Sequence, residues 1–166
     1  MKDKILPLLL VISVVSTVAI SGCIQSDAGS INGLSSTISN HLKNGDNYYN
    51  VAVQDSNKYS LDDASSNADS ALSEFNSAKS SAQQALSDAK NSKDSVLIAY
   101  MQNTVGEIDS RVNATLELQK AISYFQQKDS VNGNSHVALA NQFMDQSTQY
   151  KLNNDNIVKQ NPSKFK

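Results

Sequence analysis

The chain of 166 residues contains a single cysteine, and this scarcity excludes several ways of stabilising a small protein. One thiol cannot form a disulfide framework, a redox pair or a multi-cysteine zinc site within the chain. The body of the protein must therefore be held together by the packing of its side chains.

An excess of one charge is missing as well. Sixteen acidic residues stand against fourteen basic ones, and the net charge at pH 7 is −2. Charged residues make up 18% of the chain, compared with the usual ~25%. Because nucleic-acid binding depends on clustered Lys and Arg, this composition gives no electrostatic reason to expect a nucleic-acid partner.

Sequence patterns that carry chemistry are also absent. The chain has no Gly-x-Ser-x-Gly turn, no glycine-rich phosphate loop and no Cys-x-x-Cys-His segment. A di-iron helical bundle would need Glu-x-x-His pairs, but none of Glu74, Glu107 and Glu117 is followed by a histidine three residues later. We therefore expect a non-enzymatic protein without a cofactor.

The remaining polar candidates do not predict a metal site. His41 and His136 lie in different predicted helices, where they could meet or remain isolated. Two imidazoles alone do not form a competent metal site. Glu107 and Arg111 have i,i+4 spacing, which predicts a surface ion pair of small energetic value.

The most informative segment that is present lies at the N-terminus. Lys2 and Lys4 give a positive start, and residues 5–20 form an almost uncharged apolar run that leads to Cys23. The run is short compared with the ~20 residues of a membrane span, and Pro7 weakens it further. This order of features is typical of a signal peptide.

Residues 20–23, Ile-Ser-Gly-Cys, resemble the lipobox of prokaryotic membrane lipoproteins, in which a dedicated peptidase cuts before a lipidated cysteine. The resemblance covers residues 1–23 only, and it fits a bacterial or an archaeal source. It implies that residues 1–22 are removed as a signal peptide and that Cys23 carries a diacylglycerol thioether. An uncleaved signal anchor and ordinary secretion are the alternatives.

The same resemblance implies a location. Two acyl chains on one residue suffice for stable attachment, since each buried methylene contributes ~0.8 kcal/mol. The protein would then be lipid-anchored at the extracytoplasmic face of the cell membrane. Residues 23–30 form a small polar tether whose reach is at most ~25 Å, so the body must sit close to the membrane.

Residues 31–160 show helical periodicity and lack the alternation that a β-strand needs. A first helix is predicted over residues 31–57, although Gly45 leaves open whether one helix or two are present. A second helix follows Ser60, which has the form of a capping box with Asp63. Its apolar seam consists mostly of alanine: Leu61, Ala64, Ala68, Ala71, Phe75, Ala78, Ala82, Ala85 and Ala89.

Two further helices are predicted from turn signals and apolar stripes. Ser92 or Asp94 is expected to cap the third helix, whose apolar face shifts by roughly 120° near residues 112–115. Such a helix is either buried on two sides or bent. Residues 128–134, which contain an Asn-Gly pair flanked by polar residues, predict the next turn, and residues 161–166 are expected to fray.

These elements together predict an all-α fold, an up-down antiparallel bundle of about four helices. The alternative is a long helical hairpin that oligomerises as a coiled coil through the alanine seam.

Two positions outside the core are candidates for modification or binding. Asn113 begins an N-glycosylation sequon and points away from both stripes of its helix. Tyr48 is expected to be more exposed than Tyr49 and Tyr59, and an exposed aromatic side chain can anchor a partner.

We therefore expect a protein-interaction or structural module of the cell envelope, with an envelope protein as partner and homo-oligomerisation left open. The alternative function is a receptor for a small molecule or lipid, with its pocket inside the bundle near Val112.

Overall fold

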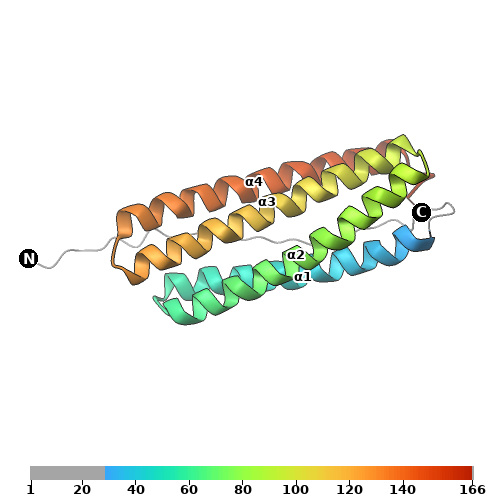
Figure 1. Cartoon of the computed structure of the whole chain (residues 1–166). Helices are drawn as coiled ribbons and strands as arrows, with labels where there is room; N and C mark the ends of the chain where they lie inside the picture. Colours follow the sequence, from blue (N-terminus) through green and yellow to red (C-terminus); the bar gives the residue numbers. More distant parts are fainter. Residues whose placement is uncertain (1–28, 166) are drawn as a thin grey trace, which may run out of the picture.

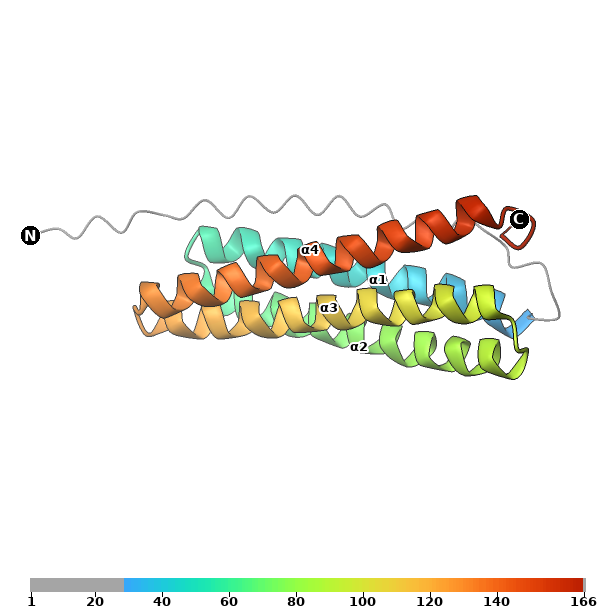
Figure 2. The same cartoon turned by 90° about the horizontal axis from the view of Figure 1, so that it is seen from above.

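The computed structural model describes the backbone of residues 29–165, with side chains from residue 33, and this part of the chain forms four long helices (Figure 1). They are α1 (Gly29–Asn57), α2 (Leu61–Asn91), α3 (Ser95–Gln126) and α4 (Ser130–Gln160). Short corners reverse the chain between them, so consecutive helices are antiparallel (Figure 2). The predicted four-helix bundle is confirmed.

The bundle is built from two helical hairpins. α1 packs along α2, α3 packs along α4, and the hairpins meet mainly through α2 and α3. No Cα atom of α1 lies within 8 Å of a Cα atom of α4. In the middle of Figure 1, α4 and α1 accordingly form the upper and lower edges of the molecule.

The alanine seam of α2 explains why α2 packs closely against two helices. All its members from residue 64 to residue 89 are fully buried, and small side chains let neighbouring backbones approach one another. The seam is thus used within the chain. The alternative of a hairpin that oligomerises through this seam is wrong.

Glycine residues sit where an aromatic ring crosses a helix. α1 is one continuous helix through Gly45. Gly45 leaves space for the Phe75 ring of α2, since a Cβ atom at Gly45 would lie 2.5 Å from that ring. The second hairpin repeats this contact, since a Cβ atom at Gly106 would lie 2.7 Å from the Tyr150 ring. Both glycines are thus required for close packing within a hairpin.

The turn predicted within residues 128–134 lies at the start of that segment, and the expectation that Asn132 and Gly133 make it is wrong. Both residues lie inside α4, and Gly133 is covered by the ring of Phe125. The chain reverses just before them, where the Asp129 carboxylate accepts a hydrogen bond of 3.1 Å from the backbone N–H of Asn132. This N-cap begins the helix ahead of the Asn-Gly pair, and the glycine contributes packing space instead of a turn.

The two predicted helix starts have different outcomes. The prediction of a capping box at Ser60 is wrong, because the Ser60 side chain makes no capping hydrogen bond. Its backbone N–H instead donates to the Asp55 carbonyl at 2.9 Å, which closes the corner through the main chain. At the next corner Asp94 is the N-cap, accepting from the N–H groups of Val96 and Leu97 at 3.0 and 3.2 Å.

The third helix and the C-terminal tail also complete the bundle. α3 is one unbroken helix, so the shift of its apolar face does not reflect a bend. The helix is instead buried on two sides. The tail does not fray at residues 164–165. Phe165 is buried against Tyr100 with ring centroids 5.0 Å apart, and Lys164 pairs with Asp94. The hydrogen bond from Lys164 holds the pKa of Asp94 below its ordinary value.

All three corners contain a non-glycine residue in the left-handed region, at Tyr59 (φ 60°), Lys93 (φ 55°) and Lys128 (φ 62°). This conformation costs ~1–2 kcal/mol for a residue with a side chain. We expect Lys128→Gly to raise the free energy of unfolding by about 0.5–1 kcal/mol, because relief of this cost exceeds the added entropy of the unfolded chain. Lys43→Gly, at an exposed site inside α1, should instead lower it by about 1 kcal/mol. Urea denaturation measures both changes, and equal signs would contradict the explanation.

Candidate functional site: a buried charged cluster

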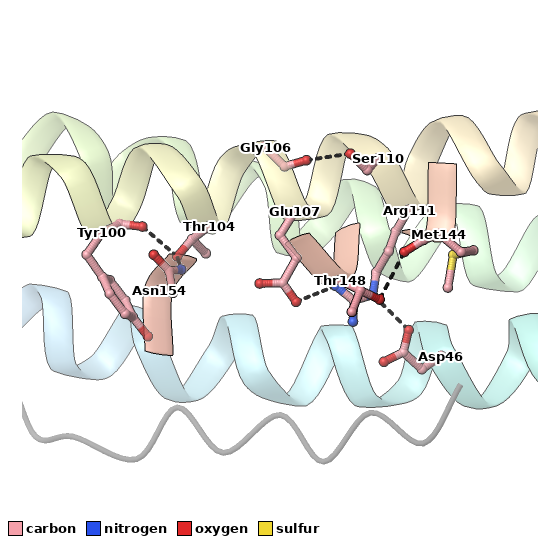
Figure 3. A network of polar contacts seen from close by, with 10 residues as sticks. All are labelled: Asp46, Tyr100, Thr104, Gly106, Glu107, Ser110, Arg111, Met144, Thr148 and Asn154. Atoms are coloured by element: carbon pink, nitrogen blue, oxygen red, sulfur yellow. Dashed lines mark hydrogen bonds and ion pairs between the residues drawn. The ribbon is translucent and has the colours of Figure 1, made fainter. Parts of the chain in front are cut away.

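A cluster of three charged side chains lies inside the bundle (Figure 3). Arg111 and Glu107 come from α3 and Asp46 from α1, and their relative exposures are only 3%, 5% and 4%. Nε of Arg111 donates to Oδ1 of Asp46 at 2.9 Å, and Nη1 of Arg111 pairs with Oε1 of Glu107. The guanidinium thus joins α1 to α3, two helices whose backbones contact each other only weakly.

The two carboxylates keep the guanidinium charged. Burial by itself would lower the pKa of Arg111, but the charges and hydrogen bonds of Glu107 and Asp46 outweigh burial and raise the pKa above its ordinary value. Arg111 therefore remains a cation inside the bundle. It faces the carboxyl groups of both Asp46 and Glu107.

Several buried side-chain oxygen atoms of α1 and α4 have no hydrogen-bond partner. Oδ2 of Asp46, the hydroxyl of Tyr49 and Oδ1 of Asn154 are all buried in this way. Tyr49 is completely covered, and its burial raises the pKa of the hydroxyl well above the ordinary value. The Tyr49 side chain is therefore neutral, and its buried hydroxyl makes no hydrogen bond. Such atoms are uncommon in folded proteins, and each calls for an explanation such as water or a ligand.

A second polar group extends the buried cluster along α3. Nδ2 of Asn154 on α4 donates to Oγ1 of Thr104 at 3.0 Å, and Thr104 donates to the Tyr100 carbonyl at 3.0 Å. Burial, followed by the charges of Glu107 and Asp155, raises the pKa of the Tyr100 hydroxyl to about 12. Polar contacts thus link α3 to α4 as well as to α1.

The prediction that Glu107 and Arg111 form a minor surface pair is wrong. Both side chains lie on the extension of the second apolar stripe of α3 toward its N-terminus, and so they face the interior. The sequence already indicated that both residues face the interior, because they belong to one uninterrupted series of positions spaced three or four residues apart. Its members are Tyr100, Thr104, Glu107, Arg111, Ala114, Leu118, Ile122 and Phe125.

The two histidines do not meet. Nδ1 of His41 lies 2.6 Å from Oε2 of Glu74, which joins α1 to α2. Nδ1 of His136 lies 2.6 Å from Oε2 of Glu117, which joins α4 to α3, and its ring stacks on Tyr124. Among the residues that the structure describes, no group of three or more His, Cys, Asp or Glu side chains could hold a metal ion.

The predicted modification sites have separate outcomes. Cys23 lies outside the described residues, so its lipidation stays a prediction. Asn113 is exposed on α3. The hydroxyl of Thr115, the third residue of the sequon, is instead fully buried and donates to the Arg111 carbonyl at 2.8 Å. The folded bundle therefore presents only part of the sequon, and glycosylation of Asn113 stays a prediction.

The exposed aromatic residues lie partly where they were expected. Tyr48 is exposed and Tyr49 is buried, as the helical pattern predicted. Tyr59, expected on the apolar stripe, is instead 54% exposed at the corner between α1 and α2. The helix has ended before this residue, so the periodicity no longer determines its direction.

No helix within residues 29–165 combines the length and hydropathy that a membrane span requires. No protein-family model matches the chain, and comparison with curated proteins and with solved structures found no match either.

Proposed function

We propose that the protein is a lipid-anchored, non-enzymatic binding module that stands on the extracytoplasmic face of the cell membrane and contacts another envelope protein. The observation that carries this proposal is the direction of the bundle. α1 begins at Gly29, shortly after Cys23 in the sequence. A lipid on Cys23 would place the Gly29 end of the bundle next to the membrane.

The opposite end is then the part available to a partner. Helices of about 30 residues are ~45 Å long, and the corners after α1 and α3 both lie at the end remote from Gly29 (left in Figure 1). That remote end carries two of the exposed large apolar side chains, Tyr59 and Val131, with relative exposures of 54% and 78%. Exposed aromatic and aliphatic residues are suitable anchors for a protein contact.

Site-specific photocrosslinking in intact membranes tests this proposal. A photoreactive amino acid at Val131 should form a discrete adduct with an envelope protein, whereas the same group at Asn91, an exposed residue at the other end of the bundle, should not. An adduct of twice the chain mass would identify a second copy as the partner. Equal labelling from both positions, or from neither, would contradict the proposed role of the remote end.

A second candidate function, a receptor for a small molecule, is favoured by one specific observation. The interior of the bundle holds the charged side chains of Arg111, Asp46 and Glu107 together with buried side-chain oxygen atoms that have no hydrogen-bond partner. A core that served packing alone gains nothing from such groups, because each unsatisfied buried polar atom costs about 1–3 kcal/mol.

A further inference from the structure

We propose that the end of the bundle at which α1 begins docks on the anionic headgroups of membrane phospholipids through three exposed lysines. Lys90, Lys93 and Lys159 form this surface, which we call the lysine patch. The inference rests on the proposed anchoring at Cys23, which brings this end of the bundle to the membrane. It adds the kind of lipid that the end recognises.

The lysine patch is assembled from two parts of the chain that are distant in sequence. Lys90 lies in the last turn of α2 and Lys93 in the corner that follows, whereas Lys159 lies in the last turn of α4. α2 and α4 both end where α1 begins, at the right in Figure 1. The ion pair between Lys164 and Asp94 joins the segment after α4 to the corner after α2. All three lysines therefore belong to the same end of the bundle.

The charges of the lysine patch are not balanced within the protein. Its three side chains are exposed, and none of them takes part in an ion pair within residues 33–165. The acidic residue of the adjoining corner, Asp94, caps α3 and pairs with Lys164 instead. The three ammonium groups can therefore contact an anionic surface without breaking an interaction in the bundle.

The two ends of the bundle differ in the sign of their charge. Residues 90–94 and 157–165 contain four lysines and one aspartate. The corners at the remote end, residues 57–63 and 126–130, contain two lysines and three aspartates. The chain as a whole has a net charge of −2, so the positive end does not follow from the composition. This polarity favours an anionic surface at the end where α1 begins.

Helix dipoles explain only part of this polarity. The partial negative charge at the end of a helix favours a lysine in the last turn, which accounts for Lys90 in α2 and Lys159 in α4. The same end of the bundle also holds the starts of α1 and α3, whose partial positive charge favours acidic residues. The first turn of neither helix contains one. The end is thus more positive than its four helix dipoles require.

The short connection to Cys23 brings the lysine patch within range of the headgroups. Cys23 and Gly29 are six residues apart, which corresponds to ~20 Å of extended chain. Attraction between lysines and anionic headgroups falls off within a Debye length, which is ~8 Å at physiological salt. The remote end, ~45 Å away along the helices, is out of range. Docking by the lysine patch would therefore hold the bundle upright, with Tyr59 and Val131 facing away from the membrane.

Energy transfer to the lipid headgroups is the test. Protein extracted from membranes is reconstituted into vesicles of phosphatidylcholine alone or of equal parts phosphatidylcholine and phosphatidylglycerol, with an acceptor dye on a small fraction of the headgroups. Ser87→Cys, at an exposed site of α2 three residues before Lys90, carries the donor dye. We expect stronger transfer on the vesicles with phosphatidylglycerol. The difference should vanish at about 1 M NaCl, where the Debye length is about 3 Å.

Replacement of the lysine patch should remove the effect. In the variant that combines Lys90→Gln, Lys93→Gln and Lys159→Gln, the ratio of docked to undocked protein should fall by about a hundred-fold, from about five-fold for each lysine near the surface. Transfer on the anionic vesicles should then equal that on phosphatidylcholine. All three side chains are exposed, so circular dichroism should show a folded bundle.

A matched variant controls for net charge. It carries Lys43→Gln, Lys58→Gln and Lys128→Gln, which remove three charges from exposed sites outside the lysine patch. This variant should retain the stronger transfer on anionic vesicles.

Three results would overturn the inference. Equal transfer on both kinds of vesicle would mean that the end does not recognise anionic headgroups, and equal losses in the two triple variants would mean a response to net charge alone. A difference that persists at about 1 M NaCl would mean that the contact is not electrostatic.

The lipid anchor and the lysine patch can fail separately. The mass of the N-terminal peptide, measured on the same sample, reports on Cys23. A lipidated Cys23 combined with transfer that is independent of the lysines would contradict the lysine patch and leave the anchor in place. An unmodified Cys23 would contradict the lipid anchor, whatever the energy transfer shows.

Discussion

Replacement of Arg111 by alanine is expected to lower the free energy of unfolding by about 3–5 kcal/mol, as measured by urea denaturation. The reason is the environment of the side chain rather than the strength of its ion pairs. Arg111 is buried with Asp46 and Glu107, and its removal leaves two carboxylates without a cation. Lys79→Ala, which breaks the ion pair with Asp109 at a partly exposed site, should cost at most about 1 kcal/mol.

A combined variant separates the cost of stranded charge from any stability that the cluster provides. When Asp46→Asn and Glu107→Gln accompany Arg111→Met, no charge is left in the interior. Most of the loss seen with Arg111→Ala should then be recovered, because a buried ion cluster can often be replaced by uncharged side chains at little cost. If Arg111→Ala cost no more than Lys79→Ala, the cluster would have to be solvated, which would contradict its burial inside the bundle.

The second large effect is expected at the contact between Gly45 and Phe75. Alanine at Gly45 would gain about 1 kcal/mol in helix propensity, but its Cβ would lie 2.5 Å from the Phe75 ring. Overpacking of this kind costs about 1–3 kcal/mol, so we expect a net loss of stability. Phe75→Ala alone, which removes a fully buried ring, should cost about 3–5 kcal/mol.

The sign of the Gly45 effect should depend on the ring. In a Phe75→Ala background, Gly45→Ala should stabilise the bundle by about 1 kcal/mol, because only the propensity gain remains. Gly33 is the matched control, since nothing lies within 4 Å of a Cβ atom there, and Gly33→Ala should be stabilising in either background. Chemical denaturation of the three single and two double variants tests this cycle, and a Gly45→Ala effect that is independent of residue 75 would contradict it.

The sequence was sufficient to predict the helices and their packing, because the spacing of apolar residues that indicates a buried helix face is repeated many times along each helix. The alanine seam of α2 recurs over its whole length, and all its alanines are buried as expected. Helix ends depend on one or two residues each. The hydroxyl of Ser60 and the Asn-Gly pair ending at Gly133 are such local signals. At the first corner the backbone hydrogen bond from Ser60 to Asp55 forms instead of the predicted cap, and at the third corner the Asp129 cap begins the helix before the Asn-Gly pair.

The charged cluster was harder to predict, because hydropathy assigns charged side chains to the surface. Glu107 and Arg111 follow the spacing of buried positions, yet Asp46, the partner that lets them be buried, is 65 residues from Arg111 in the chain. No local pattern connects residues so distant. The unpartnered oxygen of Asp46 could likewise be recognised only once the helices were placed in space.

Mass spectrometry of the N-terminal peptide of the membrane-extracted protein tests the anchored-module account most directly. The account predicts a peptide that begins at Cys23 and carries the mass of a diacylglycerol thioether, and it predicts that Cys23→Ala abolishes this species. An intact Met1, or an unmodified Cys23 at the N-terminus, would contradict the lipid anchor and the orientation of the bundle that depends on it.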